Sequence, residues 1–194
     1  MSRIAWVLAA VAIGVAVGVR SVARADEVFL TEAQAPVALF GPGMLGEAGL
    51  LSLTDPELHQ LSQAVGRRVE LRDYRYLLVR VPRDGGAGFE VGAIVVLEVV
   101  GQTLPITFAV GVRADGTLQD LQVMVYREPQ GKEINEGRFR AQFRGKAIGD
   151  PLTVEKDITA ISGATISSRS AAYAARKGLA LAAILRQRSQ KACP

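Results

Sequence analysis

One stretch of the sequence, residues 157–188, gathers serine and threonine hydroxyls at the start of a long apolar segment. The hydroxyls belong to Ser162, Thr165, Ser167, Ser168 and Ser170. Gly163 and Ala164 lie among them, and such small residues let a bulky group approach the backbone closely. A helix that begins here would offer free N–H groups and the positive end of its dipole to an anion. The stretch therefore predicts a phosphate group, either held noncovalently or esterified to a hydroxyl.

The tetrapeptide Ser162–Thr165 does not distinguish these possibilities by itself. Serine and threonine are also ordinary N-cap residues, so taken alone the four residues favour a plain capped helix. The rest of the chain contains few alternative catalytic sets, because its one histidine, His59, and its one cysteine, Cys193, cannot form a zinc site or a Cys–His pair. Two carboxylate pairs are interpreted as solvated turn and cap acids. They are Asp150 with Asp157 and Glu128 with Glu133.

The first 25 residues have the composition of a secretory signal peptide. A charged start containing Arg3 precedes an apolar run at residues 4–19, and Ala23-Arg24-Ala25 is typical of a cleavage site. The run is shorter than the ~20 residues of a typical membrane span. We therefore expect cleavage after Ala25, with a retained anchor at residues 4–19 as the alternative. Both predict a periplasmic or otherwise extracytoplasmic protein.

The charge pattern argues against nucleic-acid binding. The formal net charge is +4, and three of the positive charges are arginines of the leader, so the remainder is near +1. The other Lys and Arg residues are interspersed with acids and form no basic stripe with aromatic residues.

Hydrophobic periodicity and turn signals predict an α+β fold. Asp55 and Pro56 are typical of a helix start, and Asp115-Gly116 between two β-prone runs is typical of a hairpin. The expected elements are a helix at 56–65, strands at 69–81, 90–100, 104–112 and 118–126, a short helix at 133–143, and a last helix from about 168 to 188. Together they describe an antiparallel β-sheet meander with helices packed on one side, and a C-terminal helix that follows the hydroxyl-rich loop.

The motif Asp157-x4-Ser162-Gly163-Ala164-Thr165-Ile166-Ser167 resembles the flavinylation motif of the FMN-binding domain family. The C subunit of the sodium-pumping NADH:quinone reductase and the G subunit of the Rnf complex typify that family. The likeness extends upstream in order. It includes residues 106–112, Ala114-Asp115-Gly116, Tyr126-Arg127-Glu128-Pro129-x-Gly131 and Phe139-x3-Phe143-x-Gly145-Lys146.

The resemblance implies FMN bound covalently through its phosphate, by a phosphoester bond that a separate flavin transferase makes from FAD with magnesium. Thr165 is the first expected acceptor and Ser167 the second. The resemblance also places Glu128 and Gly131 beside the flavin and brings Lys146, Arg127 or Arg144 toward its phosphate or ring. The expected cofactor-binding residues are Thr165, Ser167, Ser162, Gly163, Ala164, Ser168, Glu128, Gly131 and Lys146. No catalytic or metal-binding residues are expected.

These observations predict four segments: a signal peptide or anchor at 1–25, an N-terminal region at 26–87 that could dock a partner, an FMN-binding domain at 88–188 and a tail at 189–194. The expected function is an extracytoplasmic electron carrier that relays electrons between membrane-associated redox partners. The alternative is an assembly or binding subunit of a membrane complex without redox chemistry. A flavin enzyme that reduces a small substrate is a further possibility, for which the sequence offers no set of proton donors.

Overall fold

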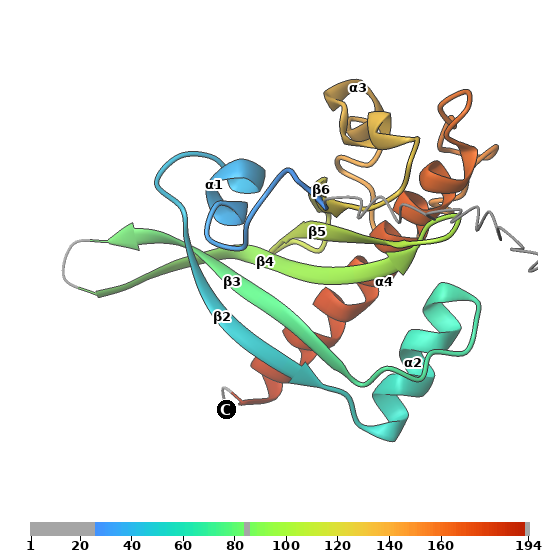
Figure 1. Cartoon of the computed structure of the whole chain (residues 1–194). Helices are drawn as coiled ribbons and strands as arrows, with labels where there is room; N and C mark the ends of the chain where they lie inside the picture. Colours follow the sequence, from blue (N-terminus) through green and yellow to red (C-terminus); the bar gives the residue numbers. More distant parts are fainter. Residues whose placement is uncertain (1–25, 84–85, 193–194) are drawn as a thin grey trace, which may run out of the picture.

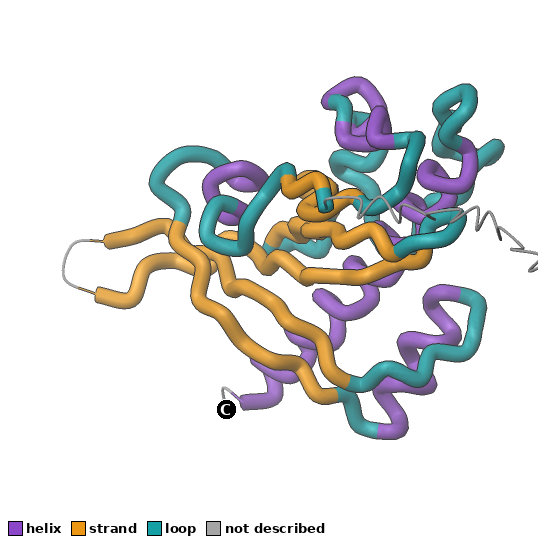
Figure 2. Tube along the Cα trace, viewed as in Figure 1, coloured by secondary structure: helices purple, strands orange, loops and turns teal. Residues whose placement is uncertain are grey.

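Six antiparallel strands form one curved sheet at the centre of the molecule (Figures 1 and 2). The computed structural model describes residues 26–83 and 86–192. The strands are β1 (Glu27–Val28), β2 (Leu45–Ser52), β3 (Asp73–Arg83), β4 (Gly86–Val100), β5 (Pro105–Arg113) and β6 (Leu118–Tyr126), in the spatial order β1-β6-β5-β4-β3-β2. Each strand from β2 to β6 lies beside the next, so the sheet is a meander. The predicted α+β class is confirmed.

Residues of the two central strands alternate between two buried faces. The helices are α1 (Ala35–Phe40), α2 (Asp55–Val65), α3 (Gly137–Arg140) and α4 (Thr165–Ala192), with a 3-10 turn at Lys132–Asn135. Leu97 of β4 pairs with Phe108 of β5, and both belong to the larger core beneath α2 and α4. Ile94 and Ala109 point to the other face, where α1 covers a smaller core. Burial on both faces explains the continuous apolar run at 90–100.

The N-terminal strands and α2 belong to the same packed unit as α4. Leu51 of β2 and Leu61 of α2 lie in the core that also contains Phe108. Helix α2 begins with a capping box, in which the Glu57 side chain accepts a hydrogen bond from the Thr54 backbone. The predicted boundary between residues 87 and 88 therefore lies inside a β-strand of a continuous sheet.

A two-pronged ion pair joins α2 to the C-terminal part of α4. Arg188 Nε lies 2.7 Å from Glu57 Oε1, and a second guanidinium nitrogen lies 2.5 Å from Oε2. The hydrogen bond from Arg188 is the main reason that the pKa of Glu57 is lowered to about 2. Figure 1 shows α4 crossing the sheet with α2 beside it.

Several elements differ from the sequence prediction. The helix expected at 133–143 is divided into the 3-10 turn and the short α3, because Glu136 between them has an extended backbone. Asn135 Oδ1 accepts a hydrogen bond from the backbone N–H of Val123, which fixes the turn against β6. Helix α4 begins at Thr165 rather than near Ser168. The prediction contained no elements corresponding to β1, α1 and β2.

The predicted leader at 1–25 and Cys193 in the predicted tail lie outside the described residues. Within the described ranges, no helix combines the length and apolar composition needed to cross a membrane.

Candidate functional site

The loop at 161–165 ends in the N-terminus of α4 and leaves donor groups free there. Gly163 has φ +79°, a left-handed conformation that glycine adopts without strain. Ala164 O accepts the first helical hydrogen bond, from Ser168 N at 2.9 Å. Within the described residues, the backbone N–H groups of Thr165, Ile166 and Ser167 have no hydrogen-bond partner. The three groups form the positive end of a 28-residue helix, as an anion site requires.

A pocket of about 230 Å³ lies at this helix end. It is lined by Gln102, Glu128, Gln130, Gly163, Ala164, Thr165, Ile166 and Ser167. Its volume is below the ~300–1,000 Å³ of pockets that enclose a drug-sized ligand. The pocket is therefore large enough for a phosphate group and smaller than pockets that enclose a whole drug-sized ligand.

Only one hydroxyl of the stretch is both free and in the pocket. Thr165 is partly exposed, and its Oγ1 has no hydrogen-bond partner in the described part of the chain. Ser167 also lines the pocket, but it is only 5% exposed and its Oγ lies 3.0 Å from Tyr126 Oη. Because the Tyr126 hydroxyl donates its proton to Gln130 O, the Ser167 hydroxyl donates to Tyr126. Ser167 is thus held by an internal bond, whereas Thr165 is not.

The remaining hydroxyls serve the loop and the helix rather than the pocket. Ser168 is fully buried, and its Oγ donates to Ala164 O and accepts from Ile161 N. Ser170 Oγ donates to Val100 O, which fastens α4 to the β4–β5 turn. Ser162 is exposed and lines a different pocket. The predicted cluster of hydroxyls therefore separates into different roles.

Gly131 lies directly behind Ser167. It has φ +96°, and a Cβ at this position would lie 2.5 Å from Ser167 Oγ and 2.8 Å from Tyr126 Oη. A side chain here would displace Ser167 or Tyr126. The same enclosure raises the pKa of Tyr126, mainly through burial and despite its hydrogen bond to Ser167. Tyr126 is therefore a neutral support for the first turn of α4.

Glu128 brings a carboxylate to the pocket. It is 6% exposed, and its Oε1 accepts hydrogen bonds from the backbone N–H groups of Thr103 and Leu104, at 2.6 and 2.8 Å. Its Oε2 is buried and has no hydrogen-bond partner among the described residues. The side chain fixes the β4–β5 turn through one oxygen and keeps the other uncommitted.

The predicted basic residues do not line the pocket. Lys146 Nζ lies 2.9 Å from Asp157 Oδ2, and Arg144 lies 3.3 Å from the buried Asp120. Arg127 bonds to Pro105 O and to Thr107 Oγ1. Asp157, the first residue of the motif, also accepts hydrogen bonds from two backbone N–H groups of its own loop. These groups hold the scaffold around the site.

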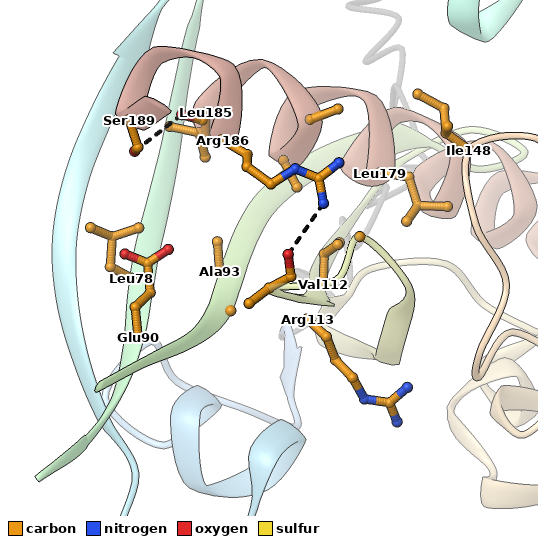
Figure 3. Close-up of a pocket in the computed structure, with 15 residues that line it drawn as sticks. Leu78, Glu90, Ala93, Val112, Arg113, Ile148, Leu179, Leu185, Arg186 and Ser189 are labelled. Carbon is orange, nitrogen blue, oxygen red and sulfur yellow. Dashed lines mark hydrogen bonds between the residues drawn. The ribbon is translucent and has the colours of Figure 1, made fainter. Parts of the chain in front are cut away.

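A second, smaller pocket of about 140 Å³ lies between α4 and the sheet (Figure 3). Apolar residues such as Val112 and Leu179 form most of its wall, and Arg186 beside it donates to Ala114 O at 3.2 Å. None of the predicted cofactor-binding residues lines it. The phosphate-sized pocket at the start of α4 is therefore the candidate site.

Residues 101–180 match the family model described as FMN-binding domain. This segment matches the FMN-binding domain family. The family resemblance inferred from the motif is thereby confirmed, and FMN is supported as the cofactor. The FMN-binding domain contains every predicted site residue and every residue that lines the pocket, from Gln102 to Ser167.

Among solved structures, the chain is similar to the crystal structure of the C subunit of the Na(+)-translocating NADH-quinone reductase from Parabacteroides distasonis. The sequence identity is 20% and the TM-score 0.46, and the match covers 71% of this chain and 75% of that chain. No curated protein matches the chain significantly.

Sequence reasoning missed three residues of the site, Gln102, Gln130 and Tyr126. Gln102 and Gln130 line the pocket from loops, and Tyr126 supports Ser167 from the end of β6. Gln130 lies within the motif element at 126–131, so the neighbouring motif residues could have indicated that it lies near the site. Gln102 lies in a short turn that carries no pattern of its own.

Proposed function

We propose that this protein is an extracytoplasmic electron-transfer flavoprotein whose FMN is joined through its phosphate to the Thr165 hydroxyl. The observation that carries the proposal is the position of Thr165 in the FMN-binding domain. Its hydroxyl is partly exposed, has no hydrogen-bond partner in the described structure, and lies in a phosphate-sized pocket at a helix N-terminus.

The surroundings of the two candidate acceptors favour Thr165 over Ser167. A flavin transferase must bring its substrate to the acceptor oxygen, which requires access from solvent. Ser167 is 5% exposed and hydrogen-bonded to Tyr126, so its reaction would require the first turn of α4 to open. Thr165 needs no such rearrangement.

Attachment is a phosphoryl transfer from FAD. The Thr165 oxygen bonds to the phosphorus of the FMN half, the bond to the AMP half breaks, AMP leaves, and the hydroxyl proton passes to a base of the transferase. The product is a phosphodiester with one negative charge. The free N–H groups at the start of α4 stabilise such a charge by ~0.3–1 kcal/mol, and by more where the site is partly buried.

The bound flavin supplies the redox chemistry, and the polypeptide positions it. The pocket is smaller than those that enclose a whole ligand, so we expect the isoalloxazine ring to stay accessible to other proteins. Accessibility suits electron exchange with a membrane-bound electron-transfer protein or complex. The apolar run at residues 4–19 supports export or anchoring at the membrane surface, where such a partner resides.

The test is the intact mass of the exported protein, produced with and without a flavin transferase. We expect wild-type protein to gain the mass of one FMN less water only when the transferase is present, and Thr165→Ala to gain nothing. Thr165→Ser keeps a hydroxyl in place and should be flavinylated, which separates loss of the acceptor from loss of the loop. A gain abolished instead by Ser167→Ala would move the attachment to Ser167. Unmodified wild-type protein would refute the proposal and favour the assembly-subunit alternative.

A further inference from the structure

Glu128 has a feature that the attachment chemistry does not use. Its Oε1 is committed to the backbone N–H groups of Thr103 and Leu104, whereas its buried Oε2 has no partner in the described structure. A buried carboxylate oxygen without a hydrogen bond is costly. The residue also lines the pocket that contains Thr165. Its negative charge therefore acts directly on whatever occupies that pocket.

No lysine, arginine or histidine is among the residues that line this pocket in the described structure. The basic side chains nearest in sequence to the pocket residues pair with acids elsewhere. Arg127 pairs with Asp26, Lys132 with Glu27 and Arg169 with Glu155. The electrostatic potential in the pocket is thus a balance between the positive end of α4 and the carboxylate of Glu128. Sites that hold a free phosphate usually add Arg or Lys to the helix end.

This balance discriminates between phosphate groups of different charge. A phosphate monoester, as in free FMN, carries a charge of about −1.5 to −2 at pH 7. A phosphodiester carries a single negative charge. The cost of removing an ion from water grows with the square of its charge, whereas its attraction to the helix end grows only linearly. A carboxylate in the pocket lowers that attraction and leaves the dianion at the larger disadvantage.

We propose that Glu128 is a charge filter, which makes the pocket accept the phosphodiester of attached FMN and reject the phosphate dianion of free FMN. The inference rests on the proposed ester at Thr165, because it explains why retention depends on the covalent bond. It also assigns Glu128 as a specificity residue of the site rather than a direct contact that strengthens FMN binding.

A charge series of unattached ligands tests the filter. The two proteins are Thr165→Ala, in which no ester can form, and the double variant Thr165→Ala, Glu128→Gln. The ligands are riboflavin, the methyl phosphodiester of FMN, and FMN, with charges of 0, −1 and about −2 at pH 7. Glutamine keeps an oxygen for the bonds from Thr103 and Leu104, so the turn is preserved. Affinity is measured by flavin fluorescence, with thermal unfolding as the check on folding.

Removing the charge should affect the ligands in proportion to their own charge. We expect Glu128→Gln to leave riboflavin unchanged, to tighten the methyl phosphodiester about tenfold, and to tighten FMN by about the square of that factor. Glu136→Gln in the same Thr165→Ala background removes an exposed acid outside the pocket and should change none of the three affinities. An equal effect on riboflavin and FMN, weaker FMN binding, or no FMN binding in either protein would overturn the inference.

The filter and the proposed function fail in distinguishable ways. The charge series involves no transferase, so it can succeed even if exported protein gains no mass. Conversely, wild-type protein could carry one FMN while Glu128→Gln leaves the charge series flat. In that case the ester stands and the role of Glu128 is confined to the turn at Thr103 and Leu104.

Discussion

Replacing Asp157 by asparagine should destabilise the loop that leads into α4, although Asp157 does not line the pocket. Its Oδ2 accepts hydrogen bonds from Lys146 Nζ at 2.9 Å and from Leu152 N at 3.0 Å, and its Oδ1 accepts one from Thr153 N at 2.8 Å. Asparagine can replace the bond to Thr153, but its NH₂ group cannot accept the other two. The motif aspartate is therefore predicted to act on the fold rather than on the cofactor.

The expected loss follows from the two bonds that asparagine cannot make. A hydrogen bond to a charged group contributes about 1.5–3 kcal/mol to stability. The side chains of Asp157 and Lys146 are 18% and 21% exposed, so solvent screens this pair less than a surface pair. Allowing for relaxation of the loop, we expect Asp157→Asn to lower the free energy of unfolding by about 3 kcal/mol, or Tm by about 6–12 °C.

The loss should also depend on pH in a defined direction. Burial alone would raise the pKa of Asp157, but the hydrogen bonds from Thr153, Lys146 and Leu152 outweigh it and hold the pKa below its usual value. A carboxyl whose pKa is lowered by folding stabilises the protein above its unfolded pKa of about 3.9. The stability difference between wild type and Asp157→Asn should be constant near neutral pH and disappear as the pH falls below about 4.

Urea unfolding of the apoprotein measures both effects without any cofactor. Glu155→Gln is the matched control in the same loop, because Glu155 is 77% exposed and lies 3.5 Å from Arg169, a surface pair worth about 0–1 kcal/mol. If Asp157→Asn is as stable as Glu155→Gln at pH 7, the scaffold role is wrong. A pocket role would then be left to explain the motif aspartate.

Two further substitutions test the packing of α4. Gly131→Ala should lower the free energy of unfolding by about 1–3 kcal/mol, because Gly131 has a positive φ and a Cβ there would lie 2.5 Å from Ser167 Oγ. The control is Gly137→Ala, where a Cβ meets open space. It should be nearly neutral in the same urea titration. Burial lowers the pKa of Lys177 to about 8, so keeping its charged form in the folded protein lowers stability most below that pH. Lys177→Met should therefore raise stability at pH 7 by about 2–3 kcal/mol and abolish the rise in wild-type stability between pH 8 and 10, whereas the exposed Lys191→Met should do neither.

The central part of the fold was predictable because its signals are local. The apolar run at 90–100 and the Asp115-Gly116 turn identify β4, β5 and β6 without any knowledge of tertiary contacts. The strand β2 was missed for the opposite reason. Its sequence contains Gly46 and Gly49, which weaken strand propensity, and it is stabilised by pairing with β3 along its whole length. Whether such a segment forms a strand depends on tertiary pairing, which a single sequence does not reveal.

The candidate site was predictable in position and not in detail. The motif at 157–167 located the start of α4, and the pocket lies there. The resemblance ranked Thr165 before Ser167, but the structural reason involves Tyr126, which lies 41 residues before Ser167 in the sequence. The basic residues expected at the phosphate were placed by resemblance, and the structure finds Lys146 paired with Asp157 instead. Which acid a basic side chain pairs with depends on the folded structure, so the sequence did not predict it.

The distribution of roles in residues 157–170 accounts for a stretch that is rich in hydroxyls but contains one proposed attachment site. Ser168 and Ser170 hold the helix to its own loop and to the β4–β5 turn, and Ser167 holds it to Tyr126. Each of these bonds holds the first turn of α4 and with it the backbone position of Thr165. A single reactive oxygen must be presented rigidly if an external enzyme is to find it, and preorganisation of this kind requires neighbours that are chemically similar but already bonded. Thr165 is therefore distinct as the pocket-lining hydroxyl of the set without an internal partner in the described structure.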